Sequence, residues 1–443
     1  MADIKTARLN SEKLADNFDD LHAPMTQHEA LVEADRCYFC YDAPCMTACP
    51  TSIDIPMFIR QISVDNPAGS AKTILQSNIM GGMCARVCPT ETLCEEVCVR
   101  EVAEGKPVKI GQLQRYATDH LMKTTDAHPF TRAASTGKKV AVVGAGPAGL
   151  SCAHRLAMHG HAVTIFEARE KAGGLNEYGI AAYKSTDQFA AKEVEFILDI
   201  GGIEVKNGVS LGKDISLDAL ESDYDAVFLG MGLPGVNGLG LDGEDANGCI
   251  DAVDYISQLR QADDLSTLEV GRNVVVIGGG MTAIDVATQV KLLGAENVTI
   301  FYRRGVENMN ASEYEQEVAQ TNGVTIRHWL QPNALEVTDG AISAITMEYT
   351  SASGGSLSGT GETVTVEADQ VFKAIGQTPA TELITSFGIT VEKGRIAVDE
   401  NRKTNKSKVW AGGDCVAGGE DLTVVSVEDG KLAAEDIHKA LSA

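Results

Sequence analysis

Residues 138–149 read KKVAVVGAGPAG, in which a short β-branched run passes directly into glycines at Gly144, Gly146 and Gly149. In a GxGxxG turn between a strand and a helix, the first glycine makes the tight turn and the second admits a pyrophosphate. The third glycine lets the helix pack closely on the strand, and the helix N-terminus faces the anion. Glu167 ends the next apolar run, where a carboxylate binds a ribose hydroxyl. The stretch therefore predicts a Rossmann-like dinucleotide site, with a purely structural glycine turn as the alternative.

A second copy of this pattern occupies residues 273–283, which read NVVVIGGGMTA. The apolar run that follows it, Val298–Tyr302, ends in Arg303 and Arg304 and carries no acid at that corner. An arginine there suits the 2′-phosphate of NADP, whereas an acid suits the free hydroxyl of NAD. The second site therefore favours NADP(H) over NAD(H), and the alternative is a solvated arginine pair.

Two such sites in one chain predict one for FAD and one for a nicotinamide coenzyme, with hydride transfer between the two rings. Gly173, Gly174 and the run Trp410–Asp414 supply further glycines for close passage of the backbone past the FAD pyrophosphate. The helix that begins near Thr423 would direct its positive N-terminal dipole at the flavin. This chemistry needs no protein acid or base, so we expect no catalytic residue on the chain.

Eight of the eleven cysteines lie between Cys37 and Cys98, in the spacings Cys-x2-Cys-x4-Cys-x3-Cys-Pro and Cys-x3-Cys-Pro-x4-Cys-x3-Cys. Thiolates in this pattern are typical of iron–sulfur clusters, in which the cysteine before proline ligates a second cluster. On this basis Cys37, Cys40 and Cys45 hold one cluster and Cys49 reaches another. Zinc and disulfides are the alternatives, but zinc sites usually repeat two close CxxC pairs and a reducing compartment disfavours disulfides.

The other three cysteines, Cys152, Cys249 and Cys415, form no close redox pair of the kind that flavoprotein disulfide reductases keep beside the flavin. Electrons must therefore leave the flavin by another route. The N-terminal clusters supply that route, because they accept electrons one at a time.

The composition restricts the partners of the chain. The 443 residues include 37 Lys and Arg against 62 Asp and Glu, for a net charge of −25. So acidic a surface argues against nucleic acid and anionic membranes as partners. No apolar signal segment or membrane span is present, which indicates a cytoplasmic protein.

The alternation of strand-like and helix-like runs after residue 138 predicts an α/β fold with two doubly wound, parallel-sheet domains behind an all-α iron–sulfur domain. The predicted domains are a helical domain with two [4Fe-4S] clusters at 1–135, a first FAD-binding segment at 136–255, an NAD(P)H-binding domain at 256–372 and a second FAD-binding segment at 373–443. The Gly/Ser/Thr-rich residues 351–361 predict a hairpin loop.

Along nearly its whole length the chain resembles the electron-input flavoproteins shared by the glutamate synthase small subunit and the N-terminal half of dihydropyrimidine dehydrogenase. The motifs that carry this resemblance are Asp42-Ala-Pro-Cys45, Cys49-Pro-Thr-Ser-Ile-Asp-Ile, Cys84-Ala-Arg-Val-Cys88-Pro-Thr, Ile110-Gly-Gln-Leu-Gln114-Arg-Tyr, Gly144-Ala-Gly-Pro-Ala-Gly149, Gly173-Gly174-Leu175, Phe301-Tyr-Arg-Arg304 and Ala411-Gly-Gly-Asp414.

The resemblance implies a cluster assignment in which a glutamine completes the second cluster, as in dihydropyrimidine dehydrogenases. The implied ligands are Cys37, Cys40, Cys45 and Cys98 for one cluster, and Cys49, Cys88, Cys94 and Gln114 for the other. Cys84 is left as a buried spare. Because the glutamate synthase small subunit looks to carry an acid at this position, Gln114 favours the dihydropyrimidine dehydrogenase branch.

The resemblance also implies the cofactor contacts. For FAD these are Gly144, Gly146, Pro147, Ala148, Glu167, Gly174, Leu175, Lys184, Leu211, Gly413, Asp414, Leu422 and Thr423. For the nicotinamide coenzyme they are Gly279, Gly280, Met281, Thr282, Arg303, Arg304, Asn310, Ala374 and Gly376. Lys184 stands where the family carries an arginine, and Asn310 stands where its NADPH-specific members carry a basic residue, which leaves NAD or dual use open.

The implied function is the electron-input subunit of a two-component dihydropyrimidine dehydrogenase. Electrons would pass from NAD(P)H through FAD and two [4Fe-4S] clusters to a separate FMN-bearing subunit that holds the pyrimidine site, in a hetero-oligomer. The alternatives are a glutamate synthase small subunit, a stand-alone NADPH:ferredoxin oxidoreductase, and a flavoprotein with a zinc-stabilised docking module.

Overall fold

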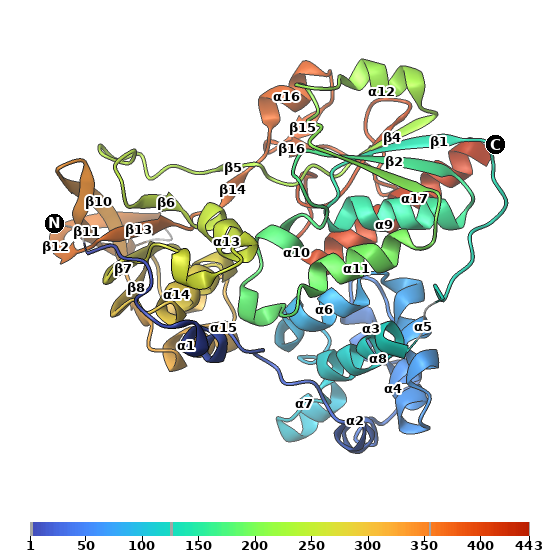
Figure 1. The fold of residues 1–443 in the computed structure, drawn as a ribbon, viewed down its shortest axis with the longest axis horizontal. Coiled ribbons are helices and arrows are strands. Elements are labelled where there is room, and N and C mark those ends of the chain that lie inside the picture. Colours follow the sequence, from blue (N-terminus) through green and yellow to red (C-terminus); the bar gives the residue numbers. More distant parts are fainter. Residues whose placement is uncertain (1–2, 125–126, 354–355, 443) are drawn as a thin grey trace. The chain divides into compact units, whose positions relative to one another are not determined.

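The computed structural model describes residues 3–124, 127–353 and 356–442. Its contacts divide the chain into two compact units, and each unit gathers three separate stretches of sequence (Figure 1). The first unit comprises residues 1–21, 178–186 and 235–378, and the second comprises residues 22–177, 187–234 and 379–443. In the described part of the chain, no helix has both the length and the apolar character needed to cross a membrane.

The second unit begins with short helices separated by the cysteine-bearing turns. These helices are α2 (Gln27–Ala34), α3 (Pro44–Ala48), α4 (Ile55–Ser63), α5 (Pro67–Ser77), α6 (Gly81–Val87), the 3₁₀ turn η1 (Thr90–Thr92), α7 (Val99–Glu104) and α8 (Ile110–Thr124). Side-chain caps fix the N-termini of several of these helices: Thr26 and Glu29 form a capping box on α2, and Asp54 caps α4. Ile55, Phe58, Ile59 and Ile62 recur at helical spacing and are buried, which gives α4 its inner face.

A five-stranded parallel sheet follows in the same unit, in the order β17-β4-β1-β2-β3. Its strands are β1 (Lys139–Val143), β2 (Ala162–Glu167), β3 (Ile203–Asn207), β4 (Ala226–Leu229) and β17 (Val409–Ala411). The helices α9 (Pro147–Met158), α11 (Phe189–Leu198) and α17 (Thr423–Ser442) lie together beside this sheet (Figure 1). One apolar core joins the sheet to the helical segment, since Phe58 and Leu113 belong to the same buried cluster as Val142 and Leu150.

The first unit contains a second parallel sheet, in the order β6-β13-β7-β8-β9. Its strands are β6 (Cys249–Asp251), β7 (Asn273–Ile277), β8 (Asn297–Tyr302), β9 (Thr325–His328) and β13 (Gln370–Lys373), and its helices are α1 (Ser11–Asn17), α13 (Ala252–Gln261), α14 (Met281–Leu292) and α15 (Glu313–Thr321). An antiparallel sheet of β10 (Leu330–Thr338), β11 (Ala341–Ser353) and β12 (Ser356–Glu367) follows β9.

Short elements complete both units. They are α10 (Leu175–Tyr178), η2 (Ala182–Lys184), α12 (Leu217–Asp223), β5 (Gly235–Val236), η3 (Leu265–Thr267), η4 (Val306–Asn308), β14 (Gln377–Thr378), α16 (Thr381–Ser386), β15 (Val391–Glu392) and β16 (Arg395–Ile396).

Most of the residue range 351–361, predicted as a hairpin loop, is paired strand, with Ser353 opposite Ser356. The predicted loop was too long, because the strands continue past Thr350 with Ser351 opposite Ser358 and Ala352 opposite Leu357. Residues 354–355 lie outside the described residues.

The first 21 residues belong to the first unit and not with the cysteine-bearing helices that follow them. Lys5 and Val270 exchange two backbone hydrogen bonds of 3.1 Å. The Arg8 guanidinium donates to the carbonyl of Gly271 at 3.0 Å, and the Asn17 amide donates to the carbonyl of Leu292 at 2.7 Å.

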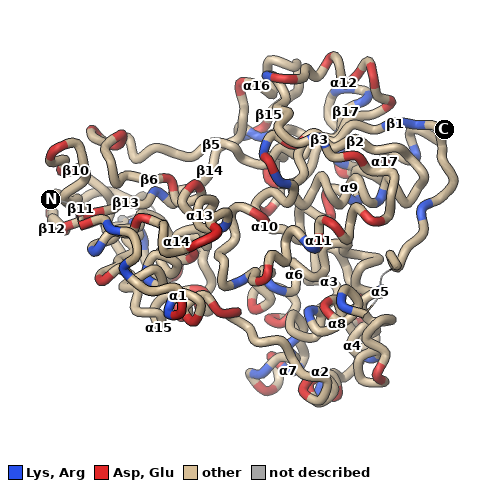
Figure 2. The backbone as a smooth tube through the Cα atoms, viewed as in Figure 1, with Lys and Arg blue, Asp and Glu red and all other residues tan. Residues whose placement is uncertain are grey.

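Acidic and basic side chains are interspersed along both units (Figure 2). The excess of acids is therefore spread over the chain, and it is not carried by a single acidic tail.

Candidate functional site

The first glycine-rich turn lies between β1 and α9, as the sequence predicts. Gly144 has a φ of 94°, and a Cβ there would stand 2.2 Å from the carbonyl oxygen of Gly230. A Cβ on Gly149 would stand 1.9 Å from the carbonyl oxygen of Gly144, so only glycine lets α9 start this close to β1. A Cβ built on Gly146 would, apart from its chain neighbours, meet only the Cα of Gly174 within 4 Å in the described part of the chain, at 3.8 Å, which leaves open space for a ligand.

Glu167 holds the backbone of this turn. Its carboxylate lies at the end of β2 and accepts hydrogen bonds from the backbone nitrogens of Ala145 at 2.7 Å and Arg169 at 2.8 Å. The carboxylate is buried, at 8% exposure. It therefore stands beside the glycine turn, at the corner where a ribose-binding acid is expected.

Two later segments return to the same turn. The backbone nitrogen of Gly173 donates to the carbonyl of Ala145 at 2.8 Å, and a Cβ on Gly174 would lie 2.7 Å from the Cα of Gly146. From the end of the chain, a Cβ on Gly413 would lie 3.0 Å from the Cβ of Ala148. The structure thus brings three predicted FAD segments together around one cradle.

The neighbouring predicted residues add polar groups at the start of α17. Asp414 accepts a hydrogen bond from the Ser426 hydroxyl at 3.2 Å, and burial raises the pKa of its carboxyl to about 6. The Thr423 hydroxyl donates to the amide oxygen of Asn176 at 2.9 Å. Leu422 is partly exposed just before α17, whereas Leu211 is buried in an apolar cluster.

Lys184 is held by two carboxylates of the first unit. Its ammonium lies 2.7 Å from Glu315 and 2.8 Å from Asp285, and all three side chains are nearly buried. These carboxylates raise the pKa of Lys184 against the opposing effect of burial. The lysine that the family resemblance associates with FAD therefore already has two anionic partners, a role that the local sequence did not indicate.

The second glycine-rich turn lies between β7 and α14. A Cβ on Gly278 would stand 2.3 Å from the carbonyl oxygen of Ala374, and one on Gly279 would stand 2.4 Å from the Tyr302 ring. A Cβ on Gly280 would meet nothing within 4 Å, so open space lies at the start of α14, where Met281 follows. The turn has room for a pyrophosphate at the helix N-terminus.

The two arginines after β8 have exposed side chains, although their backbones are fixed. The carbonyl of Arg303 accepts from the Thr350 hydroxyl at 2.7 Å, and that of Arg304 accepts from the backbone nitrogen of Trp329 at 3.2 Å. The remaining predicted coenzyme residues Thr282, Asn310, Ala374 and Gly376 are partly or fully exposed.

A cavity of about 390 Å³ lies among the first cysteine turns. Cys37, Cys40, Cys45 and Cys98 all line it, although Cys98 is far from the others in sequence. All four side chains are partly exposed. Burial and the neighbouring thiol of Cys37 raise the pKa of Cys45 to about 12, so cation binding has to displace a proton there.

A second cavity of about 380 Å³ is lined by Cys49, Cys84, Cys88, Cys94 and Gln114. Contact with Cys84 and burial raise the pKa of Cys88 well above its usual value. Within the described ranges, no group of three His, Cys, Asp or Glu side chains is placed to hold a single metal ion. Both thiol-ringed cavities suit the thiolate donor set of an iron–sulfur cluster.

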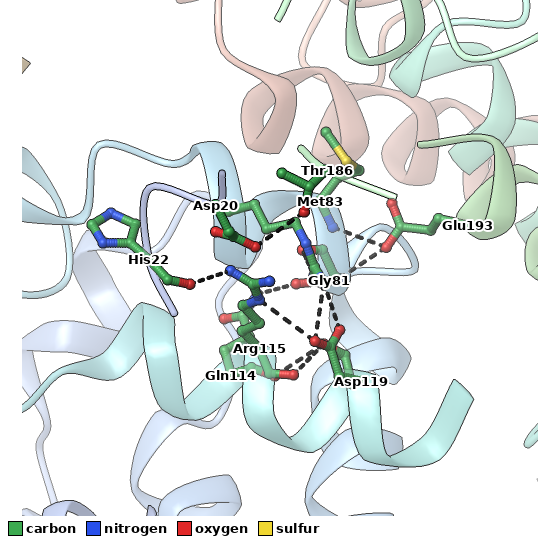
Figure 3. A network of polar contacts seen from close by, with 12 residues as sticks. Asp20, His22, Gly81, Met83, Gln114, Arg115, Asp119, Thr186 and Glu193 are labelled. Atoms are coloured by element: carbon green, nitrogen blue, oxygen red, sulfur yellow. Dashed lines mark hydrogen bonds and ion pairs between the residues drawn. The ribbon is translucent and has the colours of Figure 1, made fainter. Parts of the chain in front are cut away.

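Gln114 and Cys84 both reach the second cavity, and hydrogen bonding distinguishes them. The Gln114 amide nitrogen donates to the carbonyl of Gly81 at 2.7 Å, which leaves Oε1 as the amide atom able to act as a ligand (Figure 3). Asp119, further along α8, accepts hydrogen bonds from Nη2 of Arg86 on both of its carboxylate oxygens, at 2.8 and 3.0 Å, and contacts Arg115 as well. These contacts fix α8 against α6.

A model of pyridine nucleotide-disulphide oxidoreductases matches residues 138–430. The chain belongs to this family. A second model, described as dihydropyrimidine dehydrogenase domain II with a 4Fe-4S cluster, matches residues 14–126. The resemblance inferred from the sequence is therefore confirmed, as is the α/β fold class with its N-terminal helical iron–sulfur domain.

Relatives match the chain over nearly its whole length. The NAD-dependent dihydropyrimidine dehydrogenase subunit PreT of Salmonella typhimurium is 36% identical over 96% of this chain and 97% of its own. The small chain of the NADPH-dependent glutamate synthase of Escherichia coli is 34% identical over 95% of this chain and 93% of its own.

Solved structures share the fold at low identity. FprA of Mycobacterium tuberculosis, in complex with NADPH, aligns with a TM-score of 0.58 at 18% identity, covering 69% of this chain and 85% of its own. A thioredoxin reductase of T. acidophilum aligns with a TM-score of 0.56 at 20% identity, covering 69% of this chain and 100% of its own.

This member of the pyridine nucleotide-disulphide oxidoreductase family is thus an NAD(P)H-dependent flavoprotein oxidoreductase with a 4Fe-4S domain. Of the cysteines outside the two cavities, Cys152 lies in α9 and Cys249 in β6, whereas Cys415 follows β17.

Proposed function

We propose that this chain is the electron-input subunit of a dihydropyrimidine dehydrogenase. It takes electrons from NAD(P)H through FAD and two [4Fe-4S] clusters and delivers them to a separate FMN-bearing subunit that interconverts uracil or thymine and the 5,6-dihydropyrimidines. The observation that carries the proposal is the pair of thiol-lined cavities in one unit with the first glycine cradle. Reduced thiols at both cavities suit a cytoplasmic location.

The proposed ligands are those that the family resemblance implies, and the cavity linings support their grouping, although Cys84 also lines the second cavity. Cys37, Cys40, Cys45 and Cys98 would hold one cluster, and Cys49, Cys88, Cys94 and Gln114 the other. When bound, FAD supplies the conversion of a two-electron hydride into single electrons. The glycine cradle at Gly144 and Gly146 would hold its pyrophosphate, and Glu167 its ribose.

The linings also support a direction of transfer. Val424 lines the second cavity and directly follows Thr423, a proposed FAD contact, so the second cavity adjoins the flavin end of α17. Burial differs between the cavities: Cys49 and Cys94 are buried and Cys88 is partly exposed, whereas all four cysteines of the first cavity are partly exposed. Electrons would enter through the more buried cavity and leave through the more exposed one.

We further propose that NADP(H) is preferred. The exposed side chains of Arg303 and Arg304 at the end of β8 support this choice, because an arginine can bind the 2′-phosphate. Asn310 is the opposing feature, because it adds no charge at a position where NADPH-specific relatives carry a base. The relatives themselves differ, since one is named NAD-dependent and the other NADPH-dependent.

The decisive experiment pairs the reconstituted chain with candidate partners. Anaerobically reconstituted protein should contain about eight iron atoms per chain and should lose its flavin absorbance on addition of NADPH. Mixed with an FMN-bearing dihydropyrimidine dehydrogenase subunit, it should support NADPH oxidation that depends on uracil. The second candidate function is the small subunit of a glutamate synthase, because the chain is 34% identical to such a small chain. Glutamate formation with a glutamate synthase large subunit, without uracil reduction, would assign the chain to that function.

A further inference from the structure

Asn78 lies in the wall of the second cavity with its amide orientation fixed. It follows α5 directly, and its backbone nitrogen closes that helix on the carbonyl of Ile74 at 2.9 Å. Its side-chain oxygen accepts a hydrogen bond from the backbone nitrogen of Met80 at 3.0 Å. Because only the oxygen of an amide can accept this bond, the nitrogen Nδ2 must occupy the other side of the carboxamide.

The Asn78 amide nitrogen has no partner among the described residues. The side chain is 0% exposed, and Nδ2 is a buried donor without a hydrogen bond. A buried, unsatisfied amide donor costs about 1–3 kcal/mol, so such groups are rare unless a ligand, ion or water satisfies them. The cavity that Asn78 lines is therefore the place to look for its acceptor.

The cavity lining indicates the chemistry of that acceptor. Cys49, Cys88 and Cys94 supply sulfur atoms around the space that Asn78 borders. The other side-chain amide of the lining, that of Gln114, already donates to Gly81. Thiolate and inorganic sulfide are anionic acceptors, and a neutral amide donor complements them without adding charge.

The first cavity lacks an equivalent donor. Among the described residues that line it there is no asparagine or glutamine, and its polar side chains other than the thiols are Tyr38 and Arg100. Arg100 is committed to the carbonyl of Arg36 at 2.7 Å and to Glu104 at 2.6 Å. The two sites therefore differ in hydrogen bonding as well as in burial.

We propose that Asn78 donates an N–H···S hydrogen bond from Nδ2 to a sulfur of the iron–sulfur cluster in the second cavity, and that this bond raises the reduction potential of that cluster. The inference rests on the proposed cluster at this site. Hydrogen bonds to cluster sulfurs stabilise the more negative, reduced state, and they are one of the factors that set these potentials.

The first test detects the contact directly. Protein containing asparagine labelled with ¹⁵N at the side-chain amide is reduced at low temperature by γ-irradiation, which reduces a cluster whatever its potential. A ¹⁵N coupling in the pulsed EPR spectrum of the reduced second cluster is expected for the labelled wild type. Asn78→Asp, which keeps the shape and the acceptor oxygen but lacks the donor, should lose this coupling.

The second test measures the potential. An EPR-monitored redox titration should show the reduction equilibrium of the second cluster shifted about tenfold toward the oxidised form in the neutral variant Asn78→Leu, that is about 59 mV lower. Asn78→Asp should shift it further, because it adds a negative charge. Gln76→Glu, an exposed position on α5, is the control for added charge and should leave the potential unchanged.

The outcomes separate the two proposals. A wild type that holds about four iron atoms, with none at the second cavity, refutes the proposed cluster and with it this inference. A full iron content without ¹⁵N coupling, or variants with the wild-type potential, refutes the Asn78 bond and leaves the cluster standing. A shift in Gln76→Glu equal to that in Asn78→Asp, with none in Asn78→Leu, would attribute the effect to charge and would also overturn the inference.

Discussion

The buried carboxylate of Glu193 accepts a hydrogen bond from the backbone nitrogen of Gly82 at 2.8 Å. A second bond, from the backbone nitrogen of Met83, has a length of 3.0 Å (Figure 3). Glu193 belongs to α11, which lies beside the β-sheet, whereas Gly82 is the second residue of α6, the helix that carries Cys84 and ends at Val87, directly before Cys88. A single side chain therefore connects the flavin-side sheet to the wall of the second cavity.

The buried position of Glu193 makes stability depend on pH. Burial raises its pKa from 4.5 to about 8, so the folded state binds this proton more tightly than the unfolded state does. Its contribution to stability is therefore present at low pH and is lost as the pH rises from about 4.5 toward about 8. Glu193→Gln cannot ionise, so its melting temperature should fall less than that of the wild type between about pH 6 and about pH 9.

The control for this prediction is Glu195→Gln, an exposed position on the same helix. It should keep the pH dependence of the wild type. Parallel melting curves for Glu193→Gln and the wild type across this range would contradict the prediction.

The choice between Gln114 and Cys84 as eighth ligand predicts opposite effects on the second cluster. Gln114→Ala removes the amide oxygen that we assign as a ligand and should change the EPR signal of that cluster. Cys84→Ser, which is nearly isosteric, should leave the signal as it is. If the serine variant alone perturbs the cluster, the assignment of Gln114 is wrong.

The coenzyme preference depends on the exposed arginines after β8. The double variant Arg303→Gln, Arg304→Gln should lower kcat/KM for NADPH by about tenfold or more, because it removes charged hydrogen bonds to the 2′-phosphate. The value for NADH should change little. Arg272→Gln is the matched control, because Arg272 directly precedes β7 whereas the glycine turn follows the other end of that strand. If the double variant lost kcat/KM equally for NADPH and NADH, the assignment of the arginines to the 2′-phosphate would be wrong.

Lys184 should prove structural. Lys184→Met leaves Asp285 and Glu315 buried without a cation, which should destabilise the protein by about 3–5 kcal/mol in denaturant unfolding. Adding Glu315→Gln to this variant should recover part of the loss, because it removes one of the unpaired charges. Lys206→Met, which breaks an exposed pair with Glu204, should cost at most about 1 kcal/mol.

FAD affinity tests the other role of Lys184, a contact with FAD. If Lys184 contacts FAD, as the family resemblance implies, Lys184→Met should weaken FAD binding even in the presence of Glu315→Gln. Unchanged FAD affinity in the double variant would leave Lys184 with the structural role alone.

Local patterns in the sequence were sufficient to predict both parallel sheets and both glycine turns. The Gly144 and Gly278 turns depend on a few adjacent residues, and the structure shows why a side chain would not fit there. The proline after Cys49 indicated where the chain leaves the first group of cysteines for the second, whereas the place of Cys98 in the first group came only from the family resemblance.

The residues that the sequence did not reveal act through distant partners. Asn78 is a single asparagine at a helix end, and only the fold shows that its amide nitrogen is buried at the cavity. Glu193 looks like an ordinary helix residue, since the helix that it caps lies 110 residues away in sequence. The association of the first 21 residues with the other unit depends on backbone pairing with Val270, which no local pattern predicts.

The interleaved path of the chain has a consequence for its synthesis on the ribosome. The first unit is complete once Thr378 has emerged, whereas the second still awaits β17 and α17. Because Gly430 of α17 packs directly against the carbonyl of Ala148, the face of α9 that α17 covers stays open until α17 has emerged. Nascent chains that stall after Thr378 but before α17 has emerged would expose apolar surface on the second unit, although the first unit is already folded. Such chains would depend on chaperones.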